Sequence, residues 1–181
     1  MFRNLPLYLS LLLLMQCSKC KQDDPPPVNQ LPPATQTGAN TFDCLLNGQP
    51  YTPKGNNGTP NYAVIYDPGF QGGNLQVLTY RYLGSGSNTL QSLSIIGDSI
   101  SRVGTYRLTA TGGRKAFFLD ETRSFPCNQF AGGKGVYTNG TLTITRLDRQ
   151  TGILSGTFEF TLAQPGCDTV KVTQGRFNKK L

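Results

Sequence analysis

Residues 141–162 read TLTITRLDRQTGILSGTFEFTL, and they show the clearest two-residue alternation of apolar and polar side chains in the chain. The alternation runs on both sides of a short connection, RQTG at 149–152. Because successive side chains of a strand point to opposite faces, each half predicts a strand with one buried face. Gly152 suits a left-handed loop position, so we expect an antiparallel hairpin in which Glu159 faces solvent. The side chains expected to face the core are Leu142, Ile144, Phe158 and Phe160.

The chain from Thr41 onward has the same character. Short runs rich in Thr, Val, Ile, Tyr and Phe are cut by Gly, Asn, Asp and Pro, without a sustained helical period. The 21 glycines and 12 prolines among 181 residues agree with a chain rich in turns. Segments 105–110 and 169–173 alternate clearly and predict two further strands. Weaker candidates for strands lie at 42–46, 62–67, 74–82, 90–96 and 115–119.

Turn signals join these segments closely. Asn47-Gly48 predicts a type I′ hairpin because both residues tolerate positive φ. Gly112-Gly113 and Asn139-Gly140 predict further turns. Pro50 lacks an amide hydrogen, so the short strand at 49–51 is expected at a sheet edge. Eight or nine strands with short connections predict an all-β domain, an antiparallel meander closed as a sandwich or a barrel.

The first sixteen residues predict a lipoprotein signal peptide. The apolar run 5–15, LPLYLSLLLLM, follows Arg3 and is too short for a spanning helix, which needs about 20 apolar residues. It ends at Leu14-Met15-Gln16-Cys17, which resembles a bacterial lipobox, although Gln16 departs from the usual small residue. We therefore expect lipidation of Cys17 and anchoring by acyl chains such as palmitate. The alternative, a redox motif at 17–20, is disfavoured because lipidation consumes Cys17 and no βαβ pattern surrounds it.

Residues 17–40 predict a lipid-anchored, proline-rich tether, and residues 41–181 a single all-β domain. The segment 21–40, KQDDPPPVNQLPPATQTGAN, has five prolines and too little apolar surface to form a core. As a semi-stiff spacer it would reach roughly 30–60 Å at ~3.1 Å per residue. Asp23-Asp24 resembles the acidic export signal of surface lipoproteins in Bacteroidota-type bacteria. The expected location is therefore the cell envelope, lipid-anchored at the outer membrane.

Three cysteines belong to the domain. Export to an oxidising compartment makes one disulfide plausible. Cys127 and Cys167 follow Pro and Gly and are expected on loops, so we expect these two to be joined. Cys44 shares the parity of Phe42, which predicts a buried thiol.

The composition excludes several chemistries. There is no histidine, which removes Ser-His-Asp and Cys-His catalysis and His-ligated zinc. No calcium loop, P-loop or dinucleotide fingerprint occurs, so no metal and no cofactor is expected. From Thr41 onward there are fourteen basic and eight acidic residues. The basic residues are spread along the chain, whereas nucleic-acid binders usually cluster them. We expect no nucleic-acid partner and interpret the charge mainly as solubility.

The segment 35–42, TQTGANTF, followed by Cys44, resembles the opening of Bacteroidota-type lipoproteins with a β-rich domain of unknown function. Segments 140–148, 155–158 and 172–177 are similar to that family's C-terminal signature. The resemblance implies no established activity, ligand or catalytic residue, and it implies an acidic residue where Asn178 stands. We interpret the glycines of this signature as sites of bulges or close backbone approach.

The expected function is therefore a non-enzymatic binding or structural role, with a glycan or protein as possible ligand. The alternative is a carbohydrate-active surface protein that binds glycans or hydrolyses them weakly. Hydrolysis requires two facing carboxylates, for which the candidates are Asp120, Glu121, Asp148 and Glu159. Glycan stacking requires an exposed row of tyrosines, for which the candidates are Tyr62, Tyr66, Tyr80, Tyr82 and Tyr106. A packed interior with neither feature favours a structural role, and the ligand-binding residues are unknown at this stage.

Overall fold

The computed structural model describes residue 31 and residues 35–84, 89–133 and 135–181, and in this part of the chain it contains strands and no helix. The all-β prediction is confirmed. The predicted signal peptide, Cys17 and the spacer up to residue 30 lie outside the described residues. Within those residues, no helix is long and apolar enough to cross a membrane.

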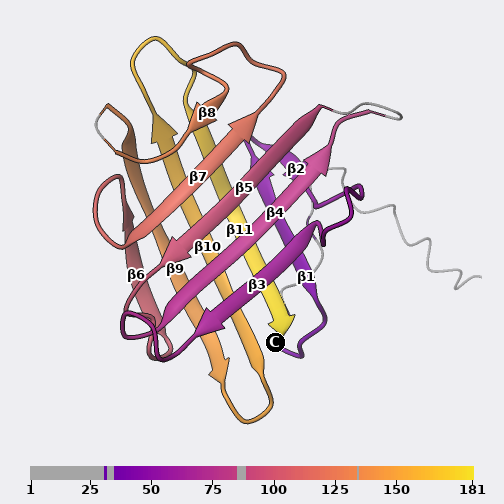
Figure 1. The fold of residues 1–181 in the computed structure, drawn as a ribbon, viewed down its shortest axis with the longest axis vertical. Coiled ribbons are helices and arrows are strands. Elements are labelled where there is room, and N and C mark those ends of the chain that lie inside the picture. The colour runs from indigo at the N-terminus through magenta and orange to yellow at the C-terminus, as the bar shows by residue number, and fades with distance from the viewer. Residues whose placement is uncertain (1–30, 32–34, 85–88, 134) are drawn as a thin grey trace, which may run out of the picture. The chain divides into compact units, whose positions relative to one another are not determined.

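Eleven strands form two antiparallel sheets (Figure 1). The six-stranded sheet has the order β2 (Gln49–Tyr51), β1 (Thr41–Leu46), β11 (Val170–Lys180), β10 (Ile153–Ala163), β9 (Tyr137–Asp148) and β6 (Gly104–Thr109). The five-stranded sheet has the order β3 (Tyr62–Asp67), β4 (Asn74–Tyr82), β5 (Leu90–Gly97), β7 (Arg114–Asp120) and β8 (Gln129–Phe130).

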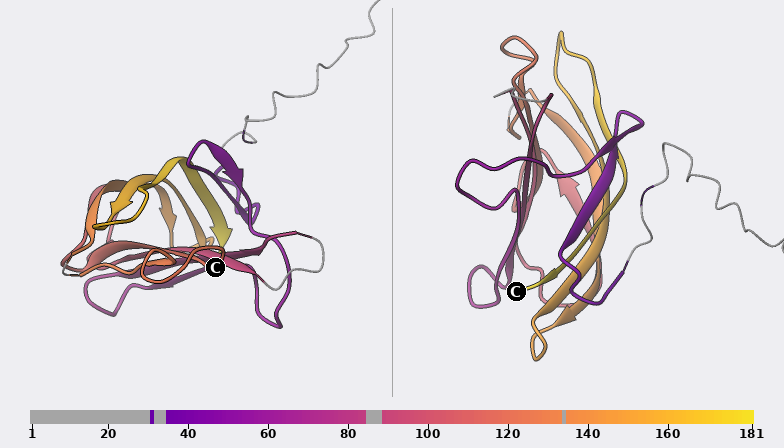
Figure 2. Two further views of the ribbon diagram at one scale, coloured as in Figure 1. Left: turned by 90° about the horizontal axis from the view of Figure 1, so that it is seen from above. Right: turned by 90° about the vertical axis from the view of Figure 1, so that its right-hand side faces the viewer.

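The two sheets face each other as a sandwich and do not close into a barrel (Figure 2). The described residues form more strands than the eight or nine expected. The strands also do not pair in the sequential order of a simple meander. β1 pairs with β11, so the first and last strands meet, and β6 leaves its sequence neighbours β5 and β7 to pair with β9 in the other sheet. Strand periodicity predicts which face of β6 is buried but not which sheet supplies its partner.

The hairpin predicted from 141–162 is confirmed and is longer than expected. β9 and β10 pair from Ile153 opposite Asp148 to Ala163 opposite Tyr137. Asn139-Gly140 therefore lies within β9, and the turn predicted there is wrong. Gly152 closes the hairpin with φ 70°, and Asn47 and Gly48 have φ 49° and 79°, as a type I′ turn requires.

Glycine and phenylalanine pair directly across the central strands of the six-stranded sheet. The three couples are Gly140 with Phe160, Gly156 with Phe177, and Gly175 with Phe158. A Cβ on Gly175 would lie 2.3 Å from Cε2 of Phe158, so the missing side chain makes room for the ring. Aromatic rings cover sheet glycines in this way and help to set strand register. The close approach expected at the signature glycines is confirmed, and the signature describes core packing.

A disulfide joins Cys127 and Cys167, as expected. Cys127 lies in the connection between β7 and β8, and Cys167 lies between β10 and β11, so the bridge links the two sheets. Cys44 is a buried free thiol. Burial raises the pKa of this thiol to about 12, which keeps it protonated and unreactive at neutral pH.

Candidate functional site

One large cavity of the described part of the chain lies where the edge of the six-stranded sheet is incomplete. β2 pairs only with residues 44–46 of β1, so residues 41–43 have no strand partner on that side. The connection between β2 and β3 borders this edge and leaves an open cavity of about 900 Å³. Its lining residues are Asn40, Thr41, Phe42, Asp43, Thr52, Pro53, Gly55, Asn56, Gly58, Thr59, Pro60, Asn61, Tyr62 and Lys179.

The polar groups of this cavity converge on Asp43 and Tyr62. Asp43 is 8% exposed and accepts a hydrogen bond from the Thr52 hydroxyl at 2.9 Å. The Lys179 ammonium lies 5.2 Å from the centre of the Tyr62 ring and donates to the Asn40 side chain. Burial raises the pKa of Tyr62, so its hydroxyl stays protonated. The cavity thus offers one carboxylate, one ammonium and several amides at fixed positions.

Residues 35–40, which we call the strap, lie against the six-stranded sheet. Asn178 is 1% exposed and holds them: its Oδ1 accepts from the Gly38 amide at 2.8 Å, and its Nδ2 donates to the Thr35 hydroxyl at 2.6 Å. Arg146 donates to the carbonyl of Gln36 at 2.7 Å. The strap belongs to the predicted spacer, yet this part of it is hydrogen-bonded to the domain. An amide suits position 178 because it donates and accepts at once, which a carboxylate does not.

Arg176 lies beside the strap, where it lines a small cavity between the strap and the six-stranded sheet. This cavity of about 70 Å³ is lined by Thr35, Thr157 and Arg176 among others. The Nη2 of Arg176 is buried and has no hydrogen-bond partner among the described residues. A buried donor of this kind is costly unless a ligand or water satisfies it.

Four cavities lie along the six-stranded sheet, and neighbouring ones share lining residues. Thr41 lines both the large cavity and the one beneath the strap. Arg176 lines the latter and a third cavity of about 510 Å³, and Glu159 lines the third and a fourth of about 230 Å³. We call these four cavities together the furrow.

The four carboxylates proposed for hydrolysis do not meet. Asp120 ends β7 and Glu121 follows it at one end of the sandwich, and Asp148 ends β9 at the other (Figure 1). Glu159 is exposed on the outer face of β10, as expected. In the described part of the chain, no cluster of three or more Cys, Asp or Glu side chains is arranged to hold a metal ion.

Two of these carboxylates have local structural roles. Burial alone would raise the pKa of Asp120, but hydrogen bonds from Thr122 and Gln91 and the charge of Arg123 outweigh it and lower the pKa. Hydrogen bonds from Thr151 and Arg146 hold the pKa of Asp148 well below its ordinary range. Both groups are thus ionised and engaged in turns, and Asp148 caps the loop of its own hairpin by accepting from the amides of Gln150 and Thr151.

The candidate tyrosines do not form an exposed row. Tyr62 is buried, and Tyr66 and Tyr106 pack against the core. Tyr80 and Tyr82 lie edge to face with ring centres 5.7 Å apart, and the Tyr80 hydroxyl is bonded to the connection between β2 and β3. A tyrosine stacking platform is therefore not present among these five side chains.

Sequence reasoning did not single out Asp43, Arg176 or Lys179 as site residues. Asp43 and Arg176 lie opposite each other where β1 pairs with β11, so this contact depends on the first and last strands of the sequence coming together. Asn178 was noticed only because the resemblance implied an acid there. Arg176 lies on the face of β11 opposite Gly175 and Phe177, so the alternation of apolar and polar residues gave no signal that singles it out.

The fold is an antiparallel β-sandwich with polar cavities along its six-stranded sheet. A family model described as "Domain of unknown function (DUF6252)" matches residues 82–180, and the chain belongs to this family. The match includes Glu159, Arg176 and Asn178 but not Asp43. No curated protein and no solved structure matches the chain. The expected domain of unknown function is confirmed, and the Bacteroidota-type lipoprotein assignment stays a prediction.

Proposed function

We propose that this chain is a lipid-anchored protein of the cell envelope, held at the outer membrane through Cys17, whose sandwich binds a ligand without catalysing a reaction. The observation that carries the binding role is the furrow, and within it Asp43 and the unpartnered Nη2 of Arg176. Sites built to bind small polar ligands combine a concave surface with a few placed polar groups.

The chemistry of the furrow favours a ligand rich in hydroxyl groups. Its large cavity presents carboxylate, amide and ammonium groups, which pair with hydroxyls as both donors and acceptors. We therefore propose a saccharide, held by hydrogen bonds rather than by tyrosine stacking.

The arrangement of acids supports binding over hydrolysis. Glycoside hydrolysis generally uses two carboxyl groups about 5–10 Å apart across one bond. Asp43 is the one carboxylate that lines the large cavity, and Glu159 is the one that lines the neighbouring cavity of about 510 Å³. A weak hydrolase thus has less support than a binding module.

Asp43→Asn is expected to weaken saccharide binding by about tenfold or more, because hydrogen bonds to a charged group contribute roughly 1.5–3 kcal/mol. A glycan microarray would identify the strongest ligand, and calorimetry would measure its affinity for each variant. Asp168→Asn is the matched control, since Asp168 is exposed on the connection before β11. Equal affinities of the two variants, or release of a hydrolysed product, would contradict the proposal.

Cys17→Ser is expected to abolish acylation in a bacterial host that processes lipoproteins. The reason is that Cys17 ends the apolar run and is the thiol that a lipobox presents. Metabolic labelling with a fatty-acid analogue measures this directly, and Cys20→Ser serves as the control that should remain labelled. If both variants carry the label, Cys17 is not the anchor.

A further inference from the structure

Several connections meet at the end of the sandwich beside the strap, which we call the strap end. The hydroxyl of Tyr66, near the end of β3, donates to the carbonyl of Ile100 at 2.7 Å. Arg149, between β9 and β10, donates to the same hydroxyl at 3.4 Å. The amide of Leu181 donates to the carbonyl of Gly152 at 2.8 Å. The connections after β3, β5 and β9 and the C-terminus therefore form one joined surface.

Large apolar side chains are exposed at this end. Phe70 lies between β3 and β4, Val103 between β5 and β6, and Leu181 after β11, and they are 53%, 56% and 52% exposed. They come from three separate segments, so no local strand pattern explains them. Exposed apolar groups that gather on one face commonly mark an interaction surface.

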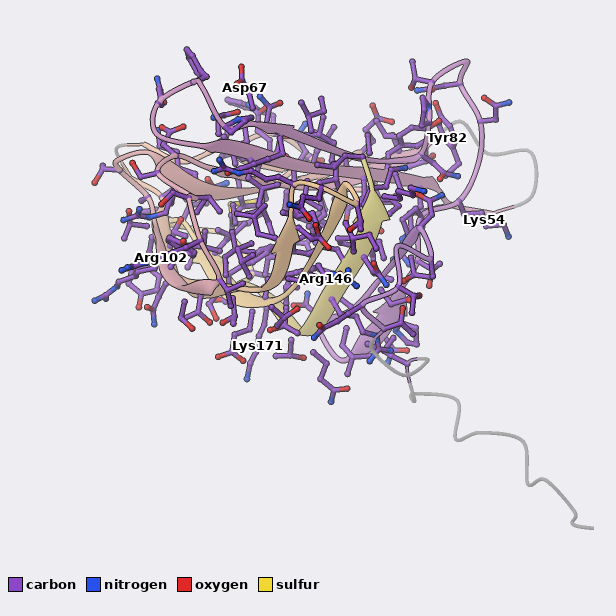
Figure 3. The ribbon with its side chains drawn as sticks, turned by 90° about the horizontal axis from the view of Figure 1, so that it is seen from below. Lys54, Asp67, Tyr82, Arg102, Arg146 and Lys171 are labelled. Atoms are coloured by element: carbon purple, nitrogen blue, oxygen red, sulfur yellow. A yellow bond between two sulfur atoms is a disulfide. The ribbon has the colours of Figure 1, made fainter. Side chains whose placement is uncertain are left out.

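The strap end carries more basic than acidic side chains. Exposed cations stand beside the apolar groups, and Arg102, Arg149 and Lys180 form no ion pair among the described residues. Figure 3 is viewed toward this end and labels Arg102, Arg146 and Asp67.

The acids of the strap end are engaged locally. Asp67 accepts from the amides of Gly69 and Phe70, and Asp148 accepts from Arg146 and from its own hairpin loop. Asp98 accepts from the side chain of Asn74 at 2.7 Å. Hydrogen bonds from neutral amides leave the charge of a carboxylate in place, so the excess of positive charge comes from the number of cations. Three carboxylates stand against five cations near this end, namely Arg102, Arg146, Arg149, Lys179 and Lys180.

The chain leading to the proposed anchor also starts here. Gly38 packs against Ile153 and Lys180, and Thr35 is bonded to Asn178, close to the end of β11. Eighteen positions separate Thr35 from Cys17. At ~3.1 Å per residue these positions would span roughly 56 Å, so an acylated Cys17 would hold the domain within about this distance of the bilayer.

We propose that the strap end docks on an anionic lipid bilayer, with Phe70, Val103 and Leu181 entering the interface and Arg102, Arg149 and Lys180 facing the headgroups. Apolar insertion combined with attraction between cations and anionic lipids is the general basis of peripheral membrane binding. The inference goes beyond the furrow and does not depend on a saccharide ligand. It relies on the proposed anchoring only for bringing the bilayer within reach.

The test uses the chain from residue 17 onward with Cys17→Ser, so that no acyl chain contributes. The probes are vesicles of phosphatidylcholine alone and of phosphatidylcholine with phosphatidylglycerol, and co-sedimentation measures binding. We expect binding to the anionic vesicles, weakened by salt because surface charges are screened. Little binding to phosphatidylcholine alone is expected.

Phe70→Ser and the double variant Arg102→Gln/Arg149→Gln are each expected to lower the partition coefficient by about tenfold. Phe125→Ser is the matched control: Phe125 is 77% exposed but follows β7 at the opposite end. Absence of binding to anionic vesicles, or an equal loss with Phe125→Ser, would overturn the proposal. Vesicle binding by a chain that binds no saccharide would keep this proposal while removing the one for the furrow.

Discussion

Phe158→Ala is expected to lower the free energy of unfolding by about 3–5 kcal/mol, through lost burial and an unfilled cavity. Phe158 is 3% exposed, and its ring stacks on Phe42 with centres 5.3 Å apart. It also covers Gly175, which has no side chain to fill the space left by the ring. Because a domain of this size is stable by roughly 5–15 kcal/mol, this loss is a large fraction of its total stability.

Urea and thermal unfolding of the unacylated chain from residue 17 would measure this loss. That chain retains the strap and its bonds to Asn178, whereas a chain that begins at Thr41 would lose them. Glu159→Ala is the neighbouring control, and it should change stability by well under ~1 kcal/mol because the side chain is exposed. A stable Phe158→Ala beside a damaged Glu159→Ala would show that the strand faces are inverted.

Removal of the disulfide by Cys127→Ser with Cys167→Ser is expected to cost about 3–4 kcal/mol. The two cysteines are 40 residues apart, and a crosslink over a loop of this length restricts the unfolded chain considerably. The bridge also joins the two sheets at the end opposite the strap, where β8 has only two residues. The loss should appear as a lower melting temperature that reducing agent does not lower further.

Cys44 provides the internal control for this experiment. Its thiol is buried and its pKa is raised, so it should resist alkylation at neutral pH until the domain unfolds. Peptide mapping without reductant should find Cys127 joined to Cys167 and Cys44 unmodified. A mapped bridge that contains Cys44 would refute both the pairing and the explanation of the stability change.

Much of the fold was predictable because its signals are local. The faces of β9 and β10 follow from the alternation around Phe158 and Phe160, and their connection follows from Gly152. The tight turn follows from Asn47-Gly48, whose positive φ values few other residue pairs adopt easily. The edge position of β2 follows from the missing amide hydrogen of Pro50.

The wrong expectations concern interactions between distant segments. Asn139-Gly140 has the composition of a turn, but Gly140 lies opposite Phe160 within a long strand. β6 shows an ordinary alternation, yet its partner is β9 rather than either neighbour in sequence. The strap has the composition of a spacer, but Asn178 binds it through two hydrogen bonds.

Several features can be predicted from the amino-acid sequence alone: the class of the domain, the buried faces of its strong strands, two of its turns and the pairing of its loop cysteines. These properties depend on side-chain alternation, backbone freedom and loop position, all of which are encoded within a few residues. The choice between sandwich and barrel, the sheet to which β6 belongs, the pairing of Asp43 with Arg176 and the binding of the strap by Asn178 all depend on the tertiary structure. The physical reason is that pairing between distant strands depends on the whole packed core, to which every segment contributes at once.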